Sequence, residues 1–192
     1  YKKIKGIKVF QSNRPIIQIA YAVDDIKKSA ELWSKKFNIG PFYINEHIKL
    51  SNTLVNGKEG EFDHSSAYGW KENMMIELIC DHKIQESPLN SNRSGIHHIA
   101  WIAPDFEKEK ILLESNNCAE VLSANSGHRD GMKFAWFDPQ NEMNHFYEIY
   151  EDTDDIRNFY SFLYEESKIW DGHNPVRNVK DSLNPLNCLL TL

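Results

Sequence analysis

A repeat 80 residues apart constrains this chain more than any other feature of its sequence. Residues 16–32 read IIQIAYAVDDIKKSAEL, and residues 96–112 read IHHIAWIAPDFEKEKIL. Identical residues occupy matched positions in the two segments, among them Ala20 and Ala100, and Asp25 and Asp105. Repeats of this length indicate duplicated supersecondary units that bury a face against each other. We therefore expect the chain to contain two copies of one structural unit.

Each copy predicts a strand followed by a helix. Residues 16–23 are rich in β-forming residues, and either Asp24 or Asp25 is placed to cap a helix over about 25–37. The second copy predicts a strand over 96–103 and a helix over 105–115.

Three further strands are expected after each helix, and the last of them carries one acid. MIELI surrounds Glu77 in the first copy, and FYEIY surrounds Glu148 in the second. Between the strands of the first copy, residues 50–60 contain Ser, Asn and two Gly, so we expect a loop there.

The pattern divides the chain into five parts. We expect an N-terminal extension at 1–15, a first βαβββ module at 16–81, a polar linker at 82–95, a second βαβββ module at 96–151, and a C-terminal helix and tail at 152–192. The tail has an apolar stripe at helical spacing, made of Ile156, Phe159, Tyr160 and Leu163. We interpret the tail as a structural flap or a dimer contact, in preference to a catalytic role.

Composition excludes several classes of function. The 192 residues carry a net charge of −6, which argues against general binding to a phosphate backbone. No apolar run approaches the roughly 20 residues of a membrane span. The start, YKKIKGIKVF, lacks the pattern of a signal peptide, and the 3 cysteines are unclustered. We therefore expect a cytoplasmic protein with neither a nucleic-acid nor a membrane partner.

Four polar residues occupy matched places in the two copies. Gln18 and His98 share one position of the repeat, and Glu77 and Glu148 share another. Period-2 alternation places each of them among small or apolar residues on one face of its strand. Two carboxylates, an imidazole and an amide on such faces would be costly to bury without a cation between them. The set predicts a divalent metal centre for Zn²⁺, Ni²⁺, Co²⁺, Mn²⁺ or Fe²⁺.

The remaining histidines are not assigned as ligands. His97 is expected on the strand face opposite to His98. His64 and His145 are placed either at a cleft mouth or in solvent. Surface positions are expected for His47, His82, His128 and His173.

These residues resemble the vicinal oxygen chelate superfamily, which includes glyoxalase I, methylmalonyl-CoA epimerase, extradiol dioxygenases and bleomycin resistance proteins. The AxxxxD start at Ala20–Asp25 and the acid in each last strand carry the resemblance over about 16–151. It implies an α+β fold in which two tandem βαβββ modules form curved mixed sheets around a shared cleft, followed here by the C-terminal helical tail. It also implies that Gln18, Glu77, His98 and Glu148 bind the metal, a ligand set like that of eukaryotic-type glyoxalase I.

The glutathione pocket of glyoxalase I is not matched. Ala22 and Ser94 stand where that family has arginines, and Asp81 stands where it has an asparagine. NIGPFYINEHI and WDGHNPVR instead resemble uncharacterised glyoxalase-like proteins.

The resemblance implies a divalent-metal-dependent isomerase, epimerase or lyase that moves a proton next to the carbonyl of a small substrate. Glu148 is the expected base, with Glu77 as the candidate on the opposite face. Two alternatives stay open. One is a metal-dependent extradiol-type dioxygenase, for which more histidine ligands would be expected. The other is a non-catalytic protein that binds small molecules. A homodimer is compatible with each of them.

Overall fold

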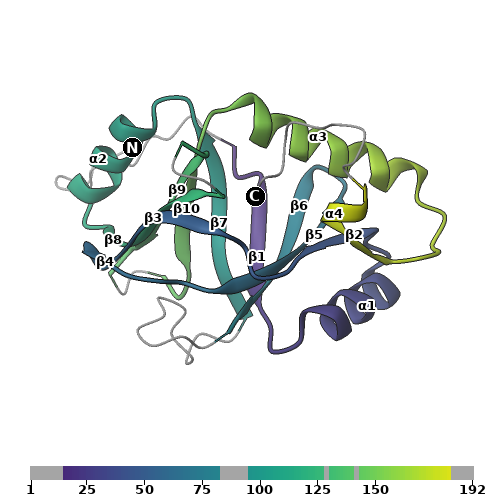
Figure 1. The fold of residues 1–192 in the computed structure, drawn as a ribbon. Coiled ribbons are helices and arrows are strands. Elements are labelled where there is room, and N and C mark those ends of the chain that lie inside the picture. Colours follow the sequence, from purple (N-terminus) through teal and green to yellow (C-terminus); the bar gives the residue numbers. More distant parts are fainter. Residues whose placement is uncertain (1–14, 83–94, 128–129, 141–142, 183–192) are drawn as a thin grey trace, which may run out of the picture.

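Both halves of the chain fold as a strand, a helix and three strands. The computed structural model describes residues 15–82, 95–127, 130–140 and 143–182. Over these residues the chain has an α+β fold with one curved sheet of 11 strands (Figure 1). Most of the expected linker and of the N-terminal extension lies outside the described residues, so the module boundaries stay predictions.

The elements of the two units correspond one to one. The first unit contains β1 (Gln18–Ala22), α1 (Ile26–Phe37), β2 (Phe42–Asn45), β5 (His64–Lys71) and β6 (Met74–Asp81). The second contains β7 (Gly95–Ala103), α2 (Phe106–Ser115), β8 (Ala119–Ser126), β9 (Lys133–Asp138) and β10 (Phe146–Glu151).

The two units join through their first strands. β1 and β7 pair antiparallel, and each also pairs in parallel with the last strand of its own unit, β6 or β10. The strand order is β11-β2-β5-β6-β1-β7-β10-β9-β8-β3-β4, where β3 is Leu50–Val55, β4 is Lys58–Glu59 and β11 is Val176–Asn178. Each unit thus has the same internal order, and the antiparallel β1–β7 pair relates the two units by an approximate two-fold rotation.

The loop expected over 50–60 is instead a β-hairpin. β3 (Leu50–Val55) and β4 (Lys58–Glu59) are joined by Asn56 and Gly57, whose φ angles are 50° and 74°. Positive φ at both central residues is the conformation that an Asn-Gly hairpin turn requires. β3 pairs with β8 of the second unit. The prediction was wrong because this pairing partner is distant in sequence and the strand carries polar residues.

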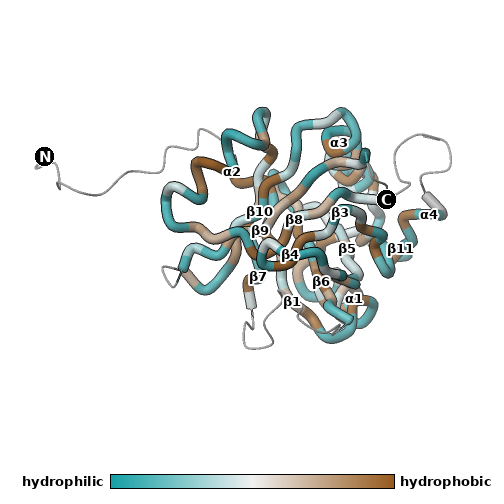
Figure 2. The backbone as a smooth tube through the Cα atoms, turned by 60° about the vertical axis from the view of Figure 1, so that its left-hand side comes forward, coloured by the Kyte–Doolittle hydropathy of each residue, from teal (hydrophilic) through white to brown (hydrophobic). Residues whose placement is uncertain are grey.

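The helices α1 and α2 begin at the expected capping residues. The carboxylate of Asp25 accepts a hydrogen bond from Lys28 N at 3.0 Å, and that of Asp105 accepts one from Lys108 N at 3.1 Å. These caps satisfy backbone donors that would otherwise lack a partner in the first turn. Figure 2 shows hydrophilic and hydrophobic segments alternating along α2 and along α3 (Asp154–Ile169). No helix within the described ranges is long and apolar enough to cross a membrane.

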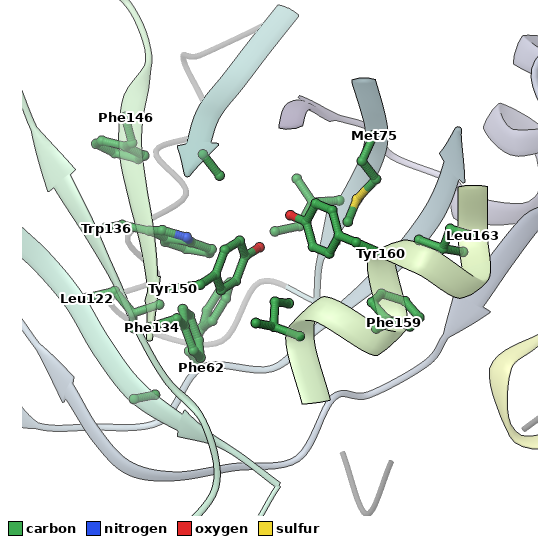
Figure 3. Close-up of a cluster of buried hydrophobic side chains, with 14 of the residues drawn as sticks. Phe62, Met75, Leu122, Phe134, Trp136, Phe146, Tyr150, Phe159, Tyr160 and Leu163 are labelled. Carbon is green, nitrogen blue, oxygen red and sulfur yellow. The ribbon is translucent and has the colours of Figure 1, made fainter. Parts of the chain in front are cut away.

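The part of the tail that the structure describes, up to residue 182, packs against the sheet. It contains α3 (Asp154–Ile169), β11 (Val176–Asn178) and α4 (Val179–Ser182). The expected stripe on α3, from Ile156 to Leu163, is buried in the same hydrophobic cluster as Met75, Trp136 and Tyr150 (Figure 3). Because this cluster contains residues of both units, α3 stabilises their association.

A polar contact at the other end of α3 fastens the tail to the first unit. Glu166 accepts hydrogen bonds from Tyr43 Oη at 2.6 Å and from Arg177 Nη1 at 2.7 Å. Burial and the neighbouring Glu166 raise the pKa of Tyr43 to about 12, so its hydroxyl keeps its proton at neutral pH. β11 adds to the sheet edge by pairing in parallel with β2.

Candidate metal centre

The strand register brings the matched polar residues of the two units to the middle of the sheet. Glu77 lies opposite Ala20 on the β1–β6 pair, and Glu148 lies opposite Ala100 on the β7–β10 pair. Both alanines are fully buried, so no bulky side chain occupies the space beside the acids. The duplication therefore repeats the same local geometry in both units.

The four side chains meet at one point. His98 Nε2 lies 2.7 Å from Glu148 Oε2 and 3.1 Å from Glu77 Oε2. Gln18 Nε2 lies 2.9 Å from His98 Nε2, donates to Glu77 Oε2, and approaches Glu148 Oε2 to 3.4 Å. The structure thus brings together all four residues expected as ligands. Their roles as ligands and as proton-transfer groups stay predictions.

The four residues of the centre are buried. Gln18, Glu77, His98 and Glu148 are 0%, 3%, 1% and 3% exposed. Burial opposes a charge on His98, but the attraction and hydrogen bonds of Glu148 and Glu77 outweigh it and raise its pKa to about 10. His98 is therefore an imidazolium between two carboxylates when no cation is bound. A bound divalent cation would replace that proton and balance both negative charges.

The donor set fits a divalent cation on chemical grounds. Glu77, His98 and Glu148 form one buried group with ligand atoms within 4.8 Å of one another. Carboxylate and imidazole ligands suit Zn²⁺ and the other first-row divalent ions, and an amide oxygen is a weaker ligand of the same kind. This donor set does not distinguish between Zn²⁺ and the other first-row divalent ions.

Two tyrosine hydroxyls orient the amide of Gln18. Its Oε1 accepts a hydrogen bond from Tyr160 Oη at 2.5 Å, and its Nε2 donates to Tyr150 Oη at 3.2 Å. The two hydroxyls point toward one another in Figure 3. Burial, with the charge of Glu148, raises both tyrosine pKa values well above 10. Hydroxyls both donate and accept, so a half-turn of the amide would aim Oε1 at the cation while Nε2 donates to the tyrosines.

Further contacts hold the carboxylate of Glu148 and the ring of His98. Trp136 Nε1 donates to Glu148 Oε1 at 2.8 Å, and Tyr150 Oη donates to Glu148 Oε2 at 2.7 Å. His97 Nδ1 lies 2.7 Å from His98 Nδ1. Outer contacts of this kind fix the orientation of ligating residues.

Three of these contacts were missed from the sequence. Tyr160 reaches the centre from the tail, for which a structural role was preferred. His97 was expected only on the opposite face, and yet its ring contacts that of His98. Trp136 was not singled out as a site residue, and yet its indole nitrogen donates to Glu148. The apolar stripe on α3 predicted that Tyr160 is buried, but no sequence signal indicated which element its hydroxyl would meet.

A pocket opens beside the centre. Glu77, Glu148 and Tyr150 line it together with side chains from β5, β9 and α3, among them His64, Tyr68, Phe134 and Phe159. The walls are mostly apolar, and the two acids supply charge on one side. A small molecule in this pocket would lie against the carboxylates while the aromatic walls exclude water.

His64 is a buried, neutral imidazole in the pocket wall, with its ring stacked on Phe62 at 4.5 Å. Burial lowers its pKa to about 4, against 6.5 in the unfolded chain. Between these values the unfolded chain binds a proton that the folded protein does not, so stability is complete above pH 6.5 and declines toward pH 4. We expect His64 to account for a loss of about 3 kcal/mol over this interval.

The measurement is urea unfolding of the wild type and of His64→Phe at several pH values from 7 to 4. Phenylalanine keeps an aromatic ring against Phe62 and cannot bind a proton. The variant should lose less stability than the wild type as the pH falls. Parallel curves for the two proteins would contradict the prediction.

Comparison with known proteins agrees with this architecture. The model of the Glyoxalase/Bleomycin resistance protein/Dioxygenase superfamily matches residues 17–136. The chain belongs to this superfamily. The match contains Gln18, Glu77 and His98, whereas Glu148 and Tyr160 lie beyond it. No curated protein sequence matches the chain.

The solved structures that are similar to this chain are distant in sequence. A hypothetical protein from Bacillus halodurans C-125 is 19% identical with a TM-score of 0.50, over 74% of this chain and 97% of that chain. Methylmalonyl-CoA epimerase from Mycobacterium tuberculosis is 14% identical with a TM-score of 0.47, over 74% and 91%. The Streptomyces coelicolor epimerase in complex with 2-nitronate-propionyl-CoA is 15% identical with a TM-score of 0.46, over 74% and 97%. At such identities the similarity concerns the fold, and the function has to be argued from the site.

Proposed function

We propose that this protein is a divalent-metal-dependent isomerase, epimerase or lyase of the glyoxalase type. Its substrate would be a small carbonyl compound, and the reaction would move a proton next to the carbonyl group. The observation that carries the proposal is the buried convergence of Glu77 and Glu148 on His98 Nε2, at 3.1 and 2.7 Å. The superfamily's name covers enzymes and resistance proteins alike, so membership alone does not decide between them.

A divalent cation bound by the four residues would supply a Lewis acid that polarises the carbonyl oxygen of the substrate. Glu148 is the proposed base. Its Oε2 takes the proton from the carbon next to the carbonyl, and the electron pair of the broken C–H bond moves toward the carbonyl oxygen. Trp136 holds the other oxygen, Oε1, at 2.8 Å and thereby fixes the direction of the carboxylate.

Glu77 is proposed to return a proton from the other side of the substrate. Glu77 and Glu148 come from β6 and β10, which flank the central β1–β7 pair on opposite sides. Delivery to the same carbon inverts it, as in an epimerase, whereas delivery to the neighbouring atom isomerises the substrate. The apolar pocket walls keep water from delivering the proton in place of Glu77, and Glu77 takes up its own proton from solvent between turnovers.

The test combines metal analysis with solvent-deuterium exchange. Purified protein is analysed for metal content, reloaded with each candidate ion, and incubated in D₂O with small 2-hydroxy ketones, 2-hydroxy aldehydes and acyl thioesters. Proton NMR then detects loss of the signal next to the carbonyl. One divalent ion per centre with exchange into one class supports the proposal. Oxygen uptake with catechols and Fe²⁺ would favour the dioxygenase, and ligand binding without metal would favour a binding protein.

Glutathione thiohemiacetals are expected to be poor substrates. Ala22 at the end of β1 and Asp81 at the end of β6 cannot replace the arginine and asparagine of the glyoxalase I pattern, and Ser94 lies outside the described residues. Each missing charged partner is expected to cost about 1.5–3 kcal/mol of binding. Steady-state kinetics with the methylglyoxal–glutathione adduct measures this, and efficient turnover would overturn it. We also propose a cytoplasmic location and a homodimer.

A further inference from the structure

A second cluster of ligand-type side chains lies on the surface, separate from the buried centre. His47, Asp63 and His82 present ligand atoms within 4.8 Å of one another. His47 Nδ1 lies 2.9 Å from both carboxylate oxygens of Asp63. The rings of His47 and His82 are stacked, with centroids 4.2 Å apart and planes inclined by 22°. Two imidazoles and a carboxylate are the donor types that bind first-row transition metals.

The backbone holds the three residues at one end of β5. His82 N donates to Asp63 O at 3.0 Å, which continues the β5–β6 pairing by one step. Next to His47, Ile48 N donates to His64 O at 2.9 Å. His47 follows β2, Asp63 precedes β5 and His82 follows β6. Backbone hydrogen bonds hold the segments of His47 and His82 against the start of β5. The cluster is thus part of the folded framework.

Ser65 supplies an outer contact to both histidines. Its Oγ lies 2.7 Å from His82 Nε2 and accepts a hydrogen bond from the backbone N of His47 at 3.0 Å. Ser65 is 1% exposed, so its position is fixed by the core. A ligating histidine commonly has one ring nitrogen held in this way, which leaves the other to bind the metal.

We propose that His47, Asp63 and His82 form a second site for a divalent transition metal such as Zn²⁺, Ni²⁺ or Cu²⁺. The side chains of His47 and Asp63 are 65% and 30% exposed, so water can complete the coordination. The ion would tie the segment after β2 to the ends of β5 and β6. This site does not depend on the proposed function of the buried centre.

The test compares Zn²⁺ binding by the wild type and by the double variant His47→Asn, His82→Asn. Asparagine is chosen because His47 has φ of 51°, a left-handed conformation that asparagine tolerates. The matched control is His173→Asn, because His173 is an exposed histidine that also pairs with an aspartate, Asp171, at 3.3 Å. Circular dichroism checks that all three proteins are folded.

Isothermal titration with Zn²⁺ should show one ion fewer per chain for the double variant than for the wild type and the control. Ser65→Ala should keep the site but weaken its affinity by about 10–100-fold, as for loss of an outer contact. Equal stoichiometry in the wild type and the double variant would overturn the proposal. His98→Ala should remove the ion of the buried centre and leave the surface site occupied. The proposed function and the proposed second site can therefore be disproved independently.

Discussion

Replacing Glu148 with glutamine is expected to lower the rate of proton exchange into the substrate by about 10²–10⁴-fold, the usual effect of removing a general base. Glutamine keeps an oxygen at the centre, so most of the metal should remain bound. Its amide does not accept a proton at neutral pH, so the chemical step is lost. The measurement is deuterium exchange by NMR, with metal content determined on the same samples.

Glu151→Gln is the matched control, because it makes the same chemical change on the same strand. Glu151 accepts a hydrogen bond from Lys133 N at 3.2 Å, away from the centre. The Glu151→Gln variant should therefore exchange deuterium into the substrate at the wild-type rate. If Glu148→Gln exchanges deuterium at a near wild-type rate, Glu148 is not the base. Glu77 would then be the base, and Glu77→Gln would be the variant that loses the exchange. Loss of metal along with exchange would show that Glu148 acts mainly as a ligand.

His98→Ala should abolish metal binding at the buried centre together with activity, and should also destabilise the metal-free protein by about 3–5 kcal/mol. The raised pKa of His98, about 10, means that its imidazolium balances Glu77 and Glu148 at neutral pH. Alanine leaves two carboxylates buried beside each other, with Gln18, Trp136 and the tyrosine hydroxyls as neutral partners and no positive charge between them. Urea unfolding in the presence of a chelator measures the change in the free energy of unfolding.

A second variant keeps this test informative if the single variant does not fold. In His98→Ala combined with Glu148→Gln, one of the two buried charges is also removed, so part of the lost stability should return. His173→Ala, at an exposed histidine, should leave the free energy of unfolding almost unchanged. A loss below about 1 kcal/mol in His98→Ala, the scale of an exposed ion pair, would contradict the role of His98 as the buried counter-charge.

The repeat was the sequence signal with the widest consequences. It predicted the order of strands and helices in both units, and it singled out Gln18, Glu77, His98 and Glu148, which the structure brings together. A duplicated unit places equivalent residues at equivalent register positions, so one alignment of the chain with itself locates all four. The caps at Asp25 and Asp105 were likewise readable, because capping is decided within one turn of chain.

Contacts between segments that are distant in the chain could not be predicted from the sequence in the same way. The β3–β4 hairpin carried a local signal in Asn56-Gly57, which predicts a turn, but the pairing of β3 with β8 has no local signal. The cluster of His47, Asp63 and His82 arises because three strand ends meet, whereas each histidine alone was interpreted as a surface residue.

The sequence by itself determined the duplicated architecture, most of the secondary structure of each unit and the four candidate metal ligands, because periodicity and repetition are properties of the chain. Only the tertiary structure decided that α3 lies over the centre, that Tyr160 reaches Gln18 at 2.5 Å, and that His97 contacts the ring of His98. These contacts depend on how a helix is rotated and how a strand pair is twisted. That is set by the packing of many side chains at once, which no single stretch of sequence encodes.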